Sequence, residues 1–365
     1  RNQDIELEDE DTENLLTSIE QELARRRFGP PVRLEIESGV GEKLRNKLCE
    51  QLDINPANVL SLPTPLDLRD LLKITDLEIP KLNFPPFRSR TVASLREVDA
   101  EEPDLFFAAI RQGEILLHHP YESFTSSVVQ FLQHAAQDPA VLAIKQTLYR
   151  TSGDSPIIEA LIEAAEAGKQ VLAVIELRAR FDEQANIDYA QQMEDEGVNL
   201  IFGVQGLKVH SKMCVIEREE DEKLKRYGFI STGNFNESTA KIYTDHTLFT
   251  SNQKILKDVN KIFSFFQINY KMYQYKHLIT SPHYTQSSVF RLIDNEIENV
   301  KAGKEGFIRL KMNSISDHPM IDKLYEASNA GVKIKLQVRG ICSLIPGVKG
   351  MSENIEAVSI VDYFL

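Results

Sequence analysis

The feature that most constrains the fold of this chain is an internal repeat. Residues 156–171 match residues 319–334, which lie 163 positions further along the chain. Each copy opens on a proline, continues as a helix-forming stretch with an apolar stripe, and reaches an aliphatic strand after Gly168 or Gly331. An apolar strand at residues 141–144 precedes the first helix and completes a parallel βαβ unit. Because all these features agree at one offset, we predict two related α/β halves.

A short polar motif lies at the entrance of an apolar strand between the two copies. His210, Ser211 and Lys212 precede residues 213–216, which are apolar and favour a strand. Side chains alternate between the two faces of a strand, so His210 and Lys212 are predicted on one face and Ser211 on the other. A lone histidine at a strand end is usually a structural residue, and the HxK pattern alone is weak.

Two asparagines strengthen the motif. Asn234 and Asn236 follow with the same two-residue spacing in a turn led by Gly233. A nucleophilic ring at His210, a cation and two amide groups that converge on one spot would suit an anionic phosphate during transfer. The pattern therefore predicts phosphate chemistry at this point of the chain.

Basic residues of the first half support that prediction, because they fall at predicted strand ends and turns, where ligands of parallel α/β sheets gather. They are Lys145, Arg150, Arg178, Arg180, Lys208, Lys212 and Lys241. Each one alone would be a solvated surface cation, but seven around one histidine favour a phosphate site. Neighbouring cations also disfavour the protonated form of His210, so a neutral ring that can attack phosphorus becomes more available.

Charge and cysteine content exclude several classes of protein. The net charge of −13 argues against a general nucleic-acid binder, and residues 1–22 alone carry nine acidic side chains. The three cysteines are isolated, without CxxC or metal-ligand spacing, so we predict a cytoplasmic protein. No apolar run reaches membrane-spanning length and the N-terminus lacks an apolar signal region, while contact with the inner face of a membrane stays open. The absence of a GxxxxGK[ST] loop excludes a conventional P-loop kinase.

The histidine pair His118-His119 is a competing candidate, because two imidazoles could ligate a metal ion. No third ligand follows nearby in the sequence. We therefore expect a loop position at which one ring is satisfied by a backbone group rather than a metal site.

The motif resembles a known signature. His210-Ser211-Lys212 with Gly233-Asn234-Phe235-Asn236 resembles the HxK…GxxN pattern of the phospholipase D-like superfamily, which is built from two such halves, although Glu217 replaces the usual aspartate. Longer segments resemble polyphosphate kinase of the histidine-phosphorylating type, and the likeness runs from about Phe28 to the last residue. They are residues 143–150, 176–183, 206–212, 231–236, 242–245, 338–344 and 359–362.

The resemblance implies reversible transfer of the γ-phosphoryl group of ATP to inorganic polyphosphate through a phosphohistidine at His210. It also implies Mg²⁺, with Arg150 and Arg180 at the family's magnesium-associated positions. An arginine cannot ligate a cation, so we expect both to hold the phosphates that carry Mg²⁺. Tyr243 and Arg339 match the family's ATP-binding positions. The remaining candidates are expected to line the phosphate path: Lys208, Lys212, Asn234, Asn236 and Arg178.

We predict an α/β fold in three parts. Residues 1–97 are part of an α+β head (middle) domain, residues 98–277 a first phospholipase D-like catalytic domain, and residues 278–365 a second, C-terminally truncated one. The resemblance also implies a homodimer through the head region. The repeat offset places the counterpart of His210 just beyond Leu365, and the family has an N-terminal domain absent here. We therefore expect a chain truncated at both ends, and whether it is active alone stays open.

Two alternatives stay open. A phospholipase D-like phosphodiesterase would use the same histidine, but it needs a paired HxK motif and would cleave diesters without ATP. A catalytically silent phosphate-binding fragment would bind polyphosphate even after the His210→Ala change. Subunit number, preferred reaction direction, product chain length and metal preference also stay open.

Overall fold

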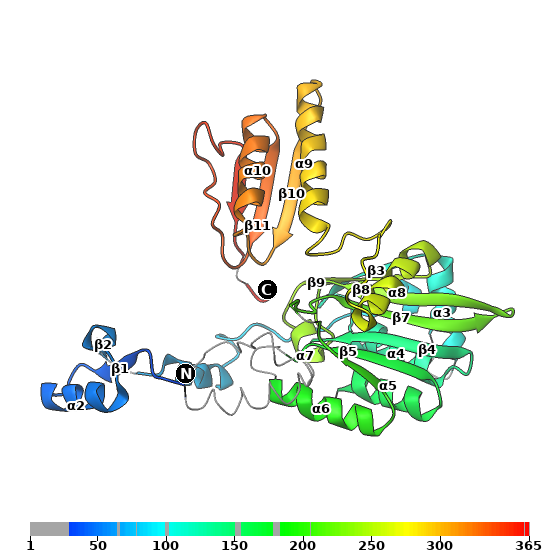
Figure 1. The fold of residues 1–365 in the computed structure, drawn as a ribbon, viewed down its shortest axis with the longest axis horizontal. Coiled ribbons are helices and arrows are strands. Elements are labelled where there is room, and N and C mark those ends of the chain that lie inside the picture. The colour runs from blue at the N-terminus through cyan, green and yellow to red at the C-terminus, as the bar shows by residue number, and fades with distance from the viewer. Residues whose placement is uncertain are drawn as a thin grey trace.

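The computed structural model contains three bodies joined by extended segments (Figure 1). Its mixture of helices with parallel and antiparallel strands confirms the predicted α/β fold class. The acidic stretch at residues 1–22 lies outside the described residues. The structure describes residues 29–63, 66–77, 79–98, 102–149, 155–177, 183–204, 206–360 and 362–364.

The first body is small. Strand β1 (Leu34–Glu37) pairs in parallel with β2 (Val59–Leu62), and helix α2 (Glu42–Leu52) connects them. Their core consists of Ile36, Cys49, Ile54 and Val59. Three short 3-10 helices lie within or after this body, and an extended connector separates the last two. They are η2 (Pro56–Asn58), η3 (Leu68–Asp76) and η4 (Ala93–Leu95).

Seven strands form the sheet of the second body, in the order β3-β9-β8-β7-β4-β5-β6. The strands β4, β5 and β6 run parallel to one another, whereas every other neighbouring pair is antiparallel. The strands are β3 (Ile115–His119), β4 (Val141–Leu148), β5 (Gln170–Ile175), β6 (Asn199–Phe202), β7 (Lys212–Glu220), β8 (Lys223–Ser231) and β9 (Asp245–Thr250).

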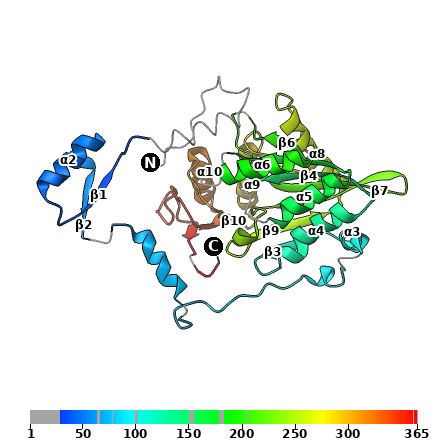
Figure 2. The same ribbon diagram turned by 90° about the horizontal axis from the view of Figure 1, so that it is seen from below.

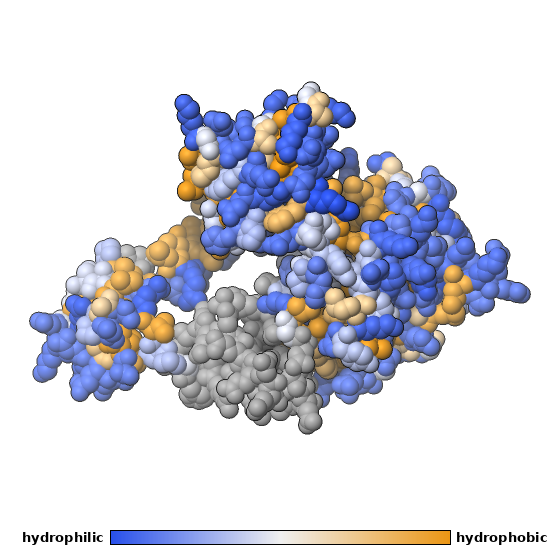
Figure 3. Space-filling view, turned by 45° about the horizontal axis from the view of Figure 1, so that its top comes forward, coloured by the Kyte–Doolittle hydropathy of each residue, from blue (hydrophilic) through white to orange (hydrophobic). Residues whose placement is uncertain are grey.

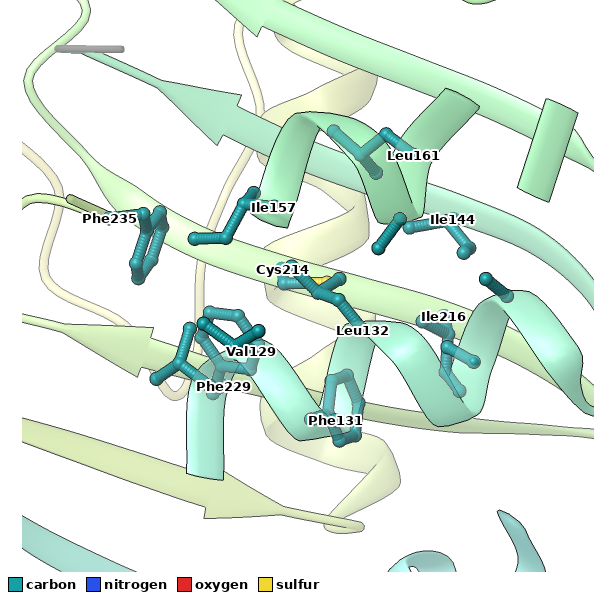
Figure 4. Close-up of a cluster of buried hydrophobic side chains, with 14 of the residues drawn as sticks. Val129, Phe131, Leu132, Ile144, Ile157, Leu161, Cys214, Ile216, Phe229 and Phe235 are labelled. Carbon is teal, nitrogen blue, oxygen red and sulfur yellow. The ribbon is translucent and has the colours of Figure 1, made fainter. Parts of the chain in front are cut away.

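Helices cover both faces of this sheet (Figures 1 and 2). Side chains along β5 alternate between two cores: Val171 and Ala173 belong to the core that includes residues of α3 to α6, while Leu172 belongs to the core that includes residues of α8. Figure 4 shows Leu132 of α4 and Ile157 of α5 beside Cys214 of β7 in the larger core. The helices are α3 (Pro103–Gln112), the π-helical η5 (Thr125–Val129), α4 (Gln130–Gln137), α5 (Pro156–Glu166), α6 (Glu183–Asp195), α7 (Glu237–Ala240) and α8 (Gln253–Gln267).

The predicted repeat is confirmed. The second body contains β4-α5-β5, and the third contains β10 (Phe307–Met312), α10 (His318–Asn329) and β11 (Lys333–Val338) in the same parallel arrangement. The helices are followed by Gly168 at φ 81° and Gly331 at φ 97°. Glycine adopts this left-handed conformation without the steric cost of a Cβ atom, so the repeated glycines permit the same sharp turn into the next strand.

The third body is a three-stranded parallel sheet in the order β10-β11-β12, completed by β12 (Ile355–Val358). Helix α9 (Thr285–Lys301) packs beside α10, and Ile293 and Ile297 of α9 join Leu324 of α10 in one core. Figure 1 shows the ends of β10 and β11 pointing toward the side of the second body where β9 and α7 lie. Within the part of the chain that the structure describes, no helix combines the length and the apolar character needed to span a membrane.

Gly228 permits the close pairing of β7 with β8. A Cβ atom at this position would lie 2.2 Å from the carbonyl oxygen of Cys214. We expect Gly228→Ala to force the strands apart and to lower the free energy of unfolding by about 1–3 kcal/mol, measured by urea denaturation. Gly113→Ala is the matched control, because a Cβ atom there would have no neighbour within 4 Å. Equal urea midpoints for the two variants would contradict the expectation.

Candidate active site

A cavity of about 1010 Å³ lies between the second and third bodies. The second body contributes the chain just after β4, the entrance of β7 and the turn before β9. The third body contributes the ends of β10 and β11. Five of the predicted site residues line this one cavity although they come from distant parts of the sequence. They are His210, Lys212, Asn234, Tyr243 and Arg339.

The entrance of β7 presents the central histidine. Strand β7 begins at Lys212, as the sequence predicts, and the side chain of His210 is exposed toward the cavity. Partial burial lowers the pKa of His210 below its ordinary value, and the charges of Lys212 and Lys208 lower it further. The ring is therefore neutral near pH 7, and a neutral imidazole has a nitrogen lone pair available for attack on phosphorus.

Lys212 lies beside this ring and is only 5% exposed. Its Nζ donates a hydrogen bond to the backbone oxygen of His210 over 2.6 Å. Burial lowers the pKa of Lys212 to about 8, although the carboxylate of Asp245 acts in the opposite direction. The ammonium thus persists near pH 7 at the cavity wall, where it can attract phosphate oxygens.

The two asparagines have different surroundings. Asn234 lines the cavity, and its Oδ1 is buried without a hydrogen-bond partner among the described residues. Asn236 is the N-cap of α7, and its Oδ1 accepts a hydrogen bond of 3.0 Å from the backbone nitrogen of Thr239. The glycine-led turn therefore directs Asn234 to the cavity, while Asn236 stabilises the helix that follows.

The third body supplies two cations to the cavity. The guanidinium of Arg339 lies 4.7 Å from the ring centroid of Tyr243, and its Nε donates to Oδ1 of Asn313 over 2.7 Å. Lys311 Nζ donates to Oγ1 of Thr244 over 2.7 Å. The turn that carries Tyr243 and Thr244 thus meets both cations, so the two bodies close around the cavity at this turn.

The other predicted cations are placed differently. Lys208 lines a second, mostly apolar cavity of about 640 Å³, which also includes His210 and Lys212 in its wall. Lys145 lies within β4 rather than at its end, and its Nζ donates to Oδ1 of Asn260 in α8. The assignment of Lys145 to a strand end was wrong. Lys241 follows α7 and is exposed to solvent.

Three arginines of the candidate set lie outside the described residues: Arg150, Arg178 and Arg180. Their nearest described neighbours are Tyr149, directly after β4, and Leu177, two residues beyond β5.

The histidine pair on β3 has two separate environments. Both ring nitrogens of His119 are within hydrogen-bond distance of oxygens, at 2.9 Å from the backbone oxygen of Glu122 and at 3.1 Å from Oγ1 of Thr247, so the predicted backbone partner is confirmed. The predicted loop position is wrong, because both histidines lie in strand β3 and pair with β9. The ring of His118 stacks on His246, with centroids 4.4 Å apart, in the wall of the large cavity. Within the described ranges, no three His, Cys, Asp or Glu side chains gather in a way that could hold a metal ion.

Sequence reasoning missed Tyr149, Glu176 and Lys311 as parts of the site. Tyr149 contacts His210, and Oε2 of Glu176 accepts a hydrogen bond of 2.7 Å from the backbone nitrogen of Val209. Two sequence signals could have found Tyr149 and Glu176: both directly follow parallel strands at the edge where ligands bind, and both lie in segments that resemble polyphosphate kinase. Lys311 had no local signal, since it reaches the cavity only when the two bodies meet.

Comparison with known proteins identifies the family. Three family models match in sequence order: Polyphosphate kinase middle domain at residues 1–74, Polyphosphate kinase C-terminal domain 1 at residues 105–272, and Polyphosphate kinase C-terminal domain 2 at residues 278–365. The chain is 47% identical over 366 residues to the polyphosphate kinase of Streptomyces coelicolor and 48% identical over 365 residues to that of Mycobacterium avium. Both alignments cover 100% of this chain, and they cover 49% and 50% of those relatives.

A solved structure agrees with these matches. The crystal structure of the polyphosphate kinase from Porphyromonas gingivalis aligns with a TM-score of 0.80 and 34% sequence identity, and it covers 92% of this chain and 51% of that one. The chain therefore spans about half the length of the curated relatives it matches. Because consecutive models of one family together extend over most of the chain, and the fold agrees, the chain belongs to the polyphosphate kinase family.

Proposed function

We propose that this chain carries the phosphotransfer centre of a reversible ATP–polyphosphate phosphotransferase, with His210 as the covalent nucleophile. The observation that carries the proposal is the placement of His210, Lys212, Tyr243 and Arg339 in the wall of one cavity, with Lys212 Nζ hydrogen-bonded to the backbone oxygen of His210. Family membership supports ATP and polyphosphate as the substrates.

The proposed transfer has two steps, one that moves the phosphoryl group to His210 and one that moves it on to polyphosphate. A ring nitrogen of His210 attacks the γ-phosphorus of ATP, and the N–P bond forms as the bond from that phosphorus to the β,γ-bridging oxygen breaks, so that ADP leaves. A terminal oxygen of polyphosphate then attacks the phosphorus and the N–P bond breaks, which regenerates neutral His210. Lys212 and the amide of Asn234 face the charge on the transferring oxygens, while Tyr243 and Arg339 hold the nucleotide.

The remaining candidates extend this site along the phosphates. We assign Lys208, Arg178, Arg150 and Arg180 to the oxygens of the ATP and polyphosphate phosphates, because guanidinium and ammonium groups are hydrogen-bond donors. Mg²⁺ would be bound by the phosphates of ATP as part of that substrate, where it would reduce their negative charge. The wall of the large cavity contains two carboxylates, those of Asp245 and Asp362, together with several cationic side chains. This mixture suits a metal ion that arrives bound to the ATP phosphates better than a metal ion held by the protein alone.

We also propose that the head region joins two copies of the chain. Helix η3 and the connector after it expose apolar side chains, including Leu68, Leu72 and Leu82. Figure 3 shows apolar residues on the narrow arm that joins the first body to the rest of the molecule. Sedimentation velocity of the full-length protein tests this assignment, and a monomer at micromolar concentration would contradict it.

A label-transfer assay tests the proposed function. Incubation of the full-length protein with γ-labelled ATP, Mg²⁺ and short-chain polyphosphate should place the label in polyphosphate, and ADP with polyphosphate should give ATP. Cleavage of a phosphodiester without ATP would instead support the phosphodiesterase. Polyphosphate binding without any label transfer would support the alternative of a catalytically silent phosphate-binding protein.

The two perturbed groups predict the pH dependence of the reaction. Attack requires neutral His210, whose pKa lies below its ordinary value, and charge stabilisation requires protonated Lys212, whose pKa is about 8. The value of kcat/KM for ATP should therefore fall in acid, as His210 becomes protonated, and fall again as the pH rises through about 8. Lys212→Met should remove the alkaline limb. A wild-type rate that keeps rising above pH 9 would contradict the assignment.

A further inference from the structure

One aromatic ring contacts both central groups of the site. Tyr149 directly follows β4 and lines the large cavity. Its ring meets that of His210 edge to face, with centroids 4.9 Å apart and an angle of 81° between the planes. This geometry is the one that the aromatic quadrupole favours, so the contact orients the imidazole and does not merely fill space beside it.

The same ring faces two ammonium groups. Lys212 Nζ lies 4.8 Å from the ring centroid of Tyr149, and Lys208 Nζ lies 6.0 Å from it. Among the described residues, no carboxylate forms an ion pair with Lys212 within 4 Å, although the charge of Asp245 acts to raise its pKa. A buried ammonium needs compensation, and here the ring face and the backbone oxygen of His210 provide it.

Hydrogen bonds connect the backbone of Tyr149 to the segment that carries His210 and Lys212. Nδ2 of the buried Asn186 donates to the backbone oxygens of both Tyr149 and Glu176, each over 3.0 Å. The carboxylate of Glu176 in turn accepts from the backbone nitrogen of Val209, next to His210. The ends of β4 and β5 and the segment before β7 are thus tied together.

We infer that Tyr149 is a positioning residue whose ring fixes the orientation of His210 and holds the ammonium of Lys212 beside it. This inference rests on the proposed function, in which those two groups perform the transfer. The ring face carries the role, since among the described residues the hydroxyl of Tyr149 has no hydrogen-bond partner. Phenylalanine should therefore replace tyrosine, whereas leucine, of similar apolar character but without a π face, should not.

The test compares Tyr149→Phe and Tyr149→Leu in the full-length protein. Rapid-quench measurement of phosphohistidine formation should give a Phe variant within about 3-fold of wild type. The Leu variant should be slower by about 10-fold or more at saturating ATP, with a nearly unchanged KM. Its alkaline limb should begin roughly half a pH unit lower, because the Lys212 ammonium has lost the ring face. The control is Tyr270→Leu, since Tyr270 is 87% exposed.

A second readout does not depend on turnover. Titration of ¹³Cε-labelled lysine by NMR follows Lys212 directly, and its pKa should fall in the Leu variant and not in the Phe variant. Unchanged rates and pKa in the Leu variant would overturn the inference, as would a Phe variant as impaired as Leu. If wild type forms no phosphohistidine, the proposed function fails, and an unchanged lysine titration in the Leu variant would then overturn the positioning role separately.

Discussion

We expect the change of His210 to Gln in the full-length protein to lower the rate of the proposed phosphoryl transfer from ATP to polyphosphate by at least about 10⁴-fold. The amide of glutamine resembles one edge of the imidazole in shape and polarity, but it cannot form a phosphoramidate. The covalent route is therefore lost, while the cations and the nucleotide site remain. Label transfer at saturating ATP measures the rate. Equilibrium binding of ATP and polyphosphate should change little, because the proposal assigns His210 to the reacting phosphorus.

The matched control is His318→Gln, since His318 is exposed at the start of α10 and does not line the large cavity. It should keep the wild-type rate. Transfer at more than a tenth of the wild-type rate in His210→Gln would show that another group forms the covalent bond or that the phosphoryl group passes directly between the substrates.

Lys212→Met should lower kcat by about 10²–10³-fold, the cost of removing one preorganised charge from a site of developing negative charge. Methionine retains most of the length and packing of lysine without the ammonium. Stability should respond in the opposite sense, because the buried Lys212 ammonium loses hydration and forms no ion pair with a described carboxylate. The free energy of unfolding at pH 7 should therefore stay equal or rise.

This opposite response separates a catalytic role for Lys212 from a structural one. Lys254→Met, at an exposed position near the start of α8, serves as the control and should leave kcat and the urea midpoint unchanged. A Lys212→Met protein that loses stability in proportion to activity would contradict the electrostatic role.

The two α/β halves could be predicted because their signals are local. A helix stripe, a terminal glycine and an aliphatic strand are all readable within 16 residues, and Gly168 and Gly331 adopt the left-handed conformation that explains their presence. The position of Lys212 at a strand entrance was predictable for the same reason, since the apolar run after it is the strand β7.

The rest of the site depends on tertiary contacts. Tyr149 approaches His210 only because β4 and β7 are neighbours in the sheet, and Lys311 reaches the cavity only because the third body meets the second. Lys145 was predicted at a strand end because it is charged, yet it lies in the middle of β4. Its ammonium is accommodated there because Asn260 of α8 accepts a hydrogen bond from it. For Asn236, the same residue type serves equally as a phosphate ligand and a helix cap, and the spacing alone could not separate the two.

The most direct test of the proposal is intact-mass spectrometry of the chain after incubation with Mg²⁺ and ATP, beside its His210→Ala variant. The proposal predicts one added phosphoryl group on the wild-type protein alone, lost in acid and stable in alkali, as expected for a phosphoramidate. The full-length protein is measured in parallel, so that any requirement for segments outside this chain is separated from the chemistry of His210. An adduct on His210→Ala, or no adduct on either wild-type protein, would contradict a phosphohistidine at this position.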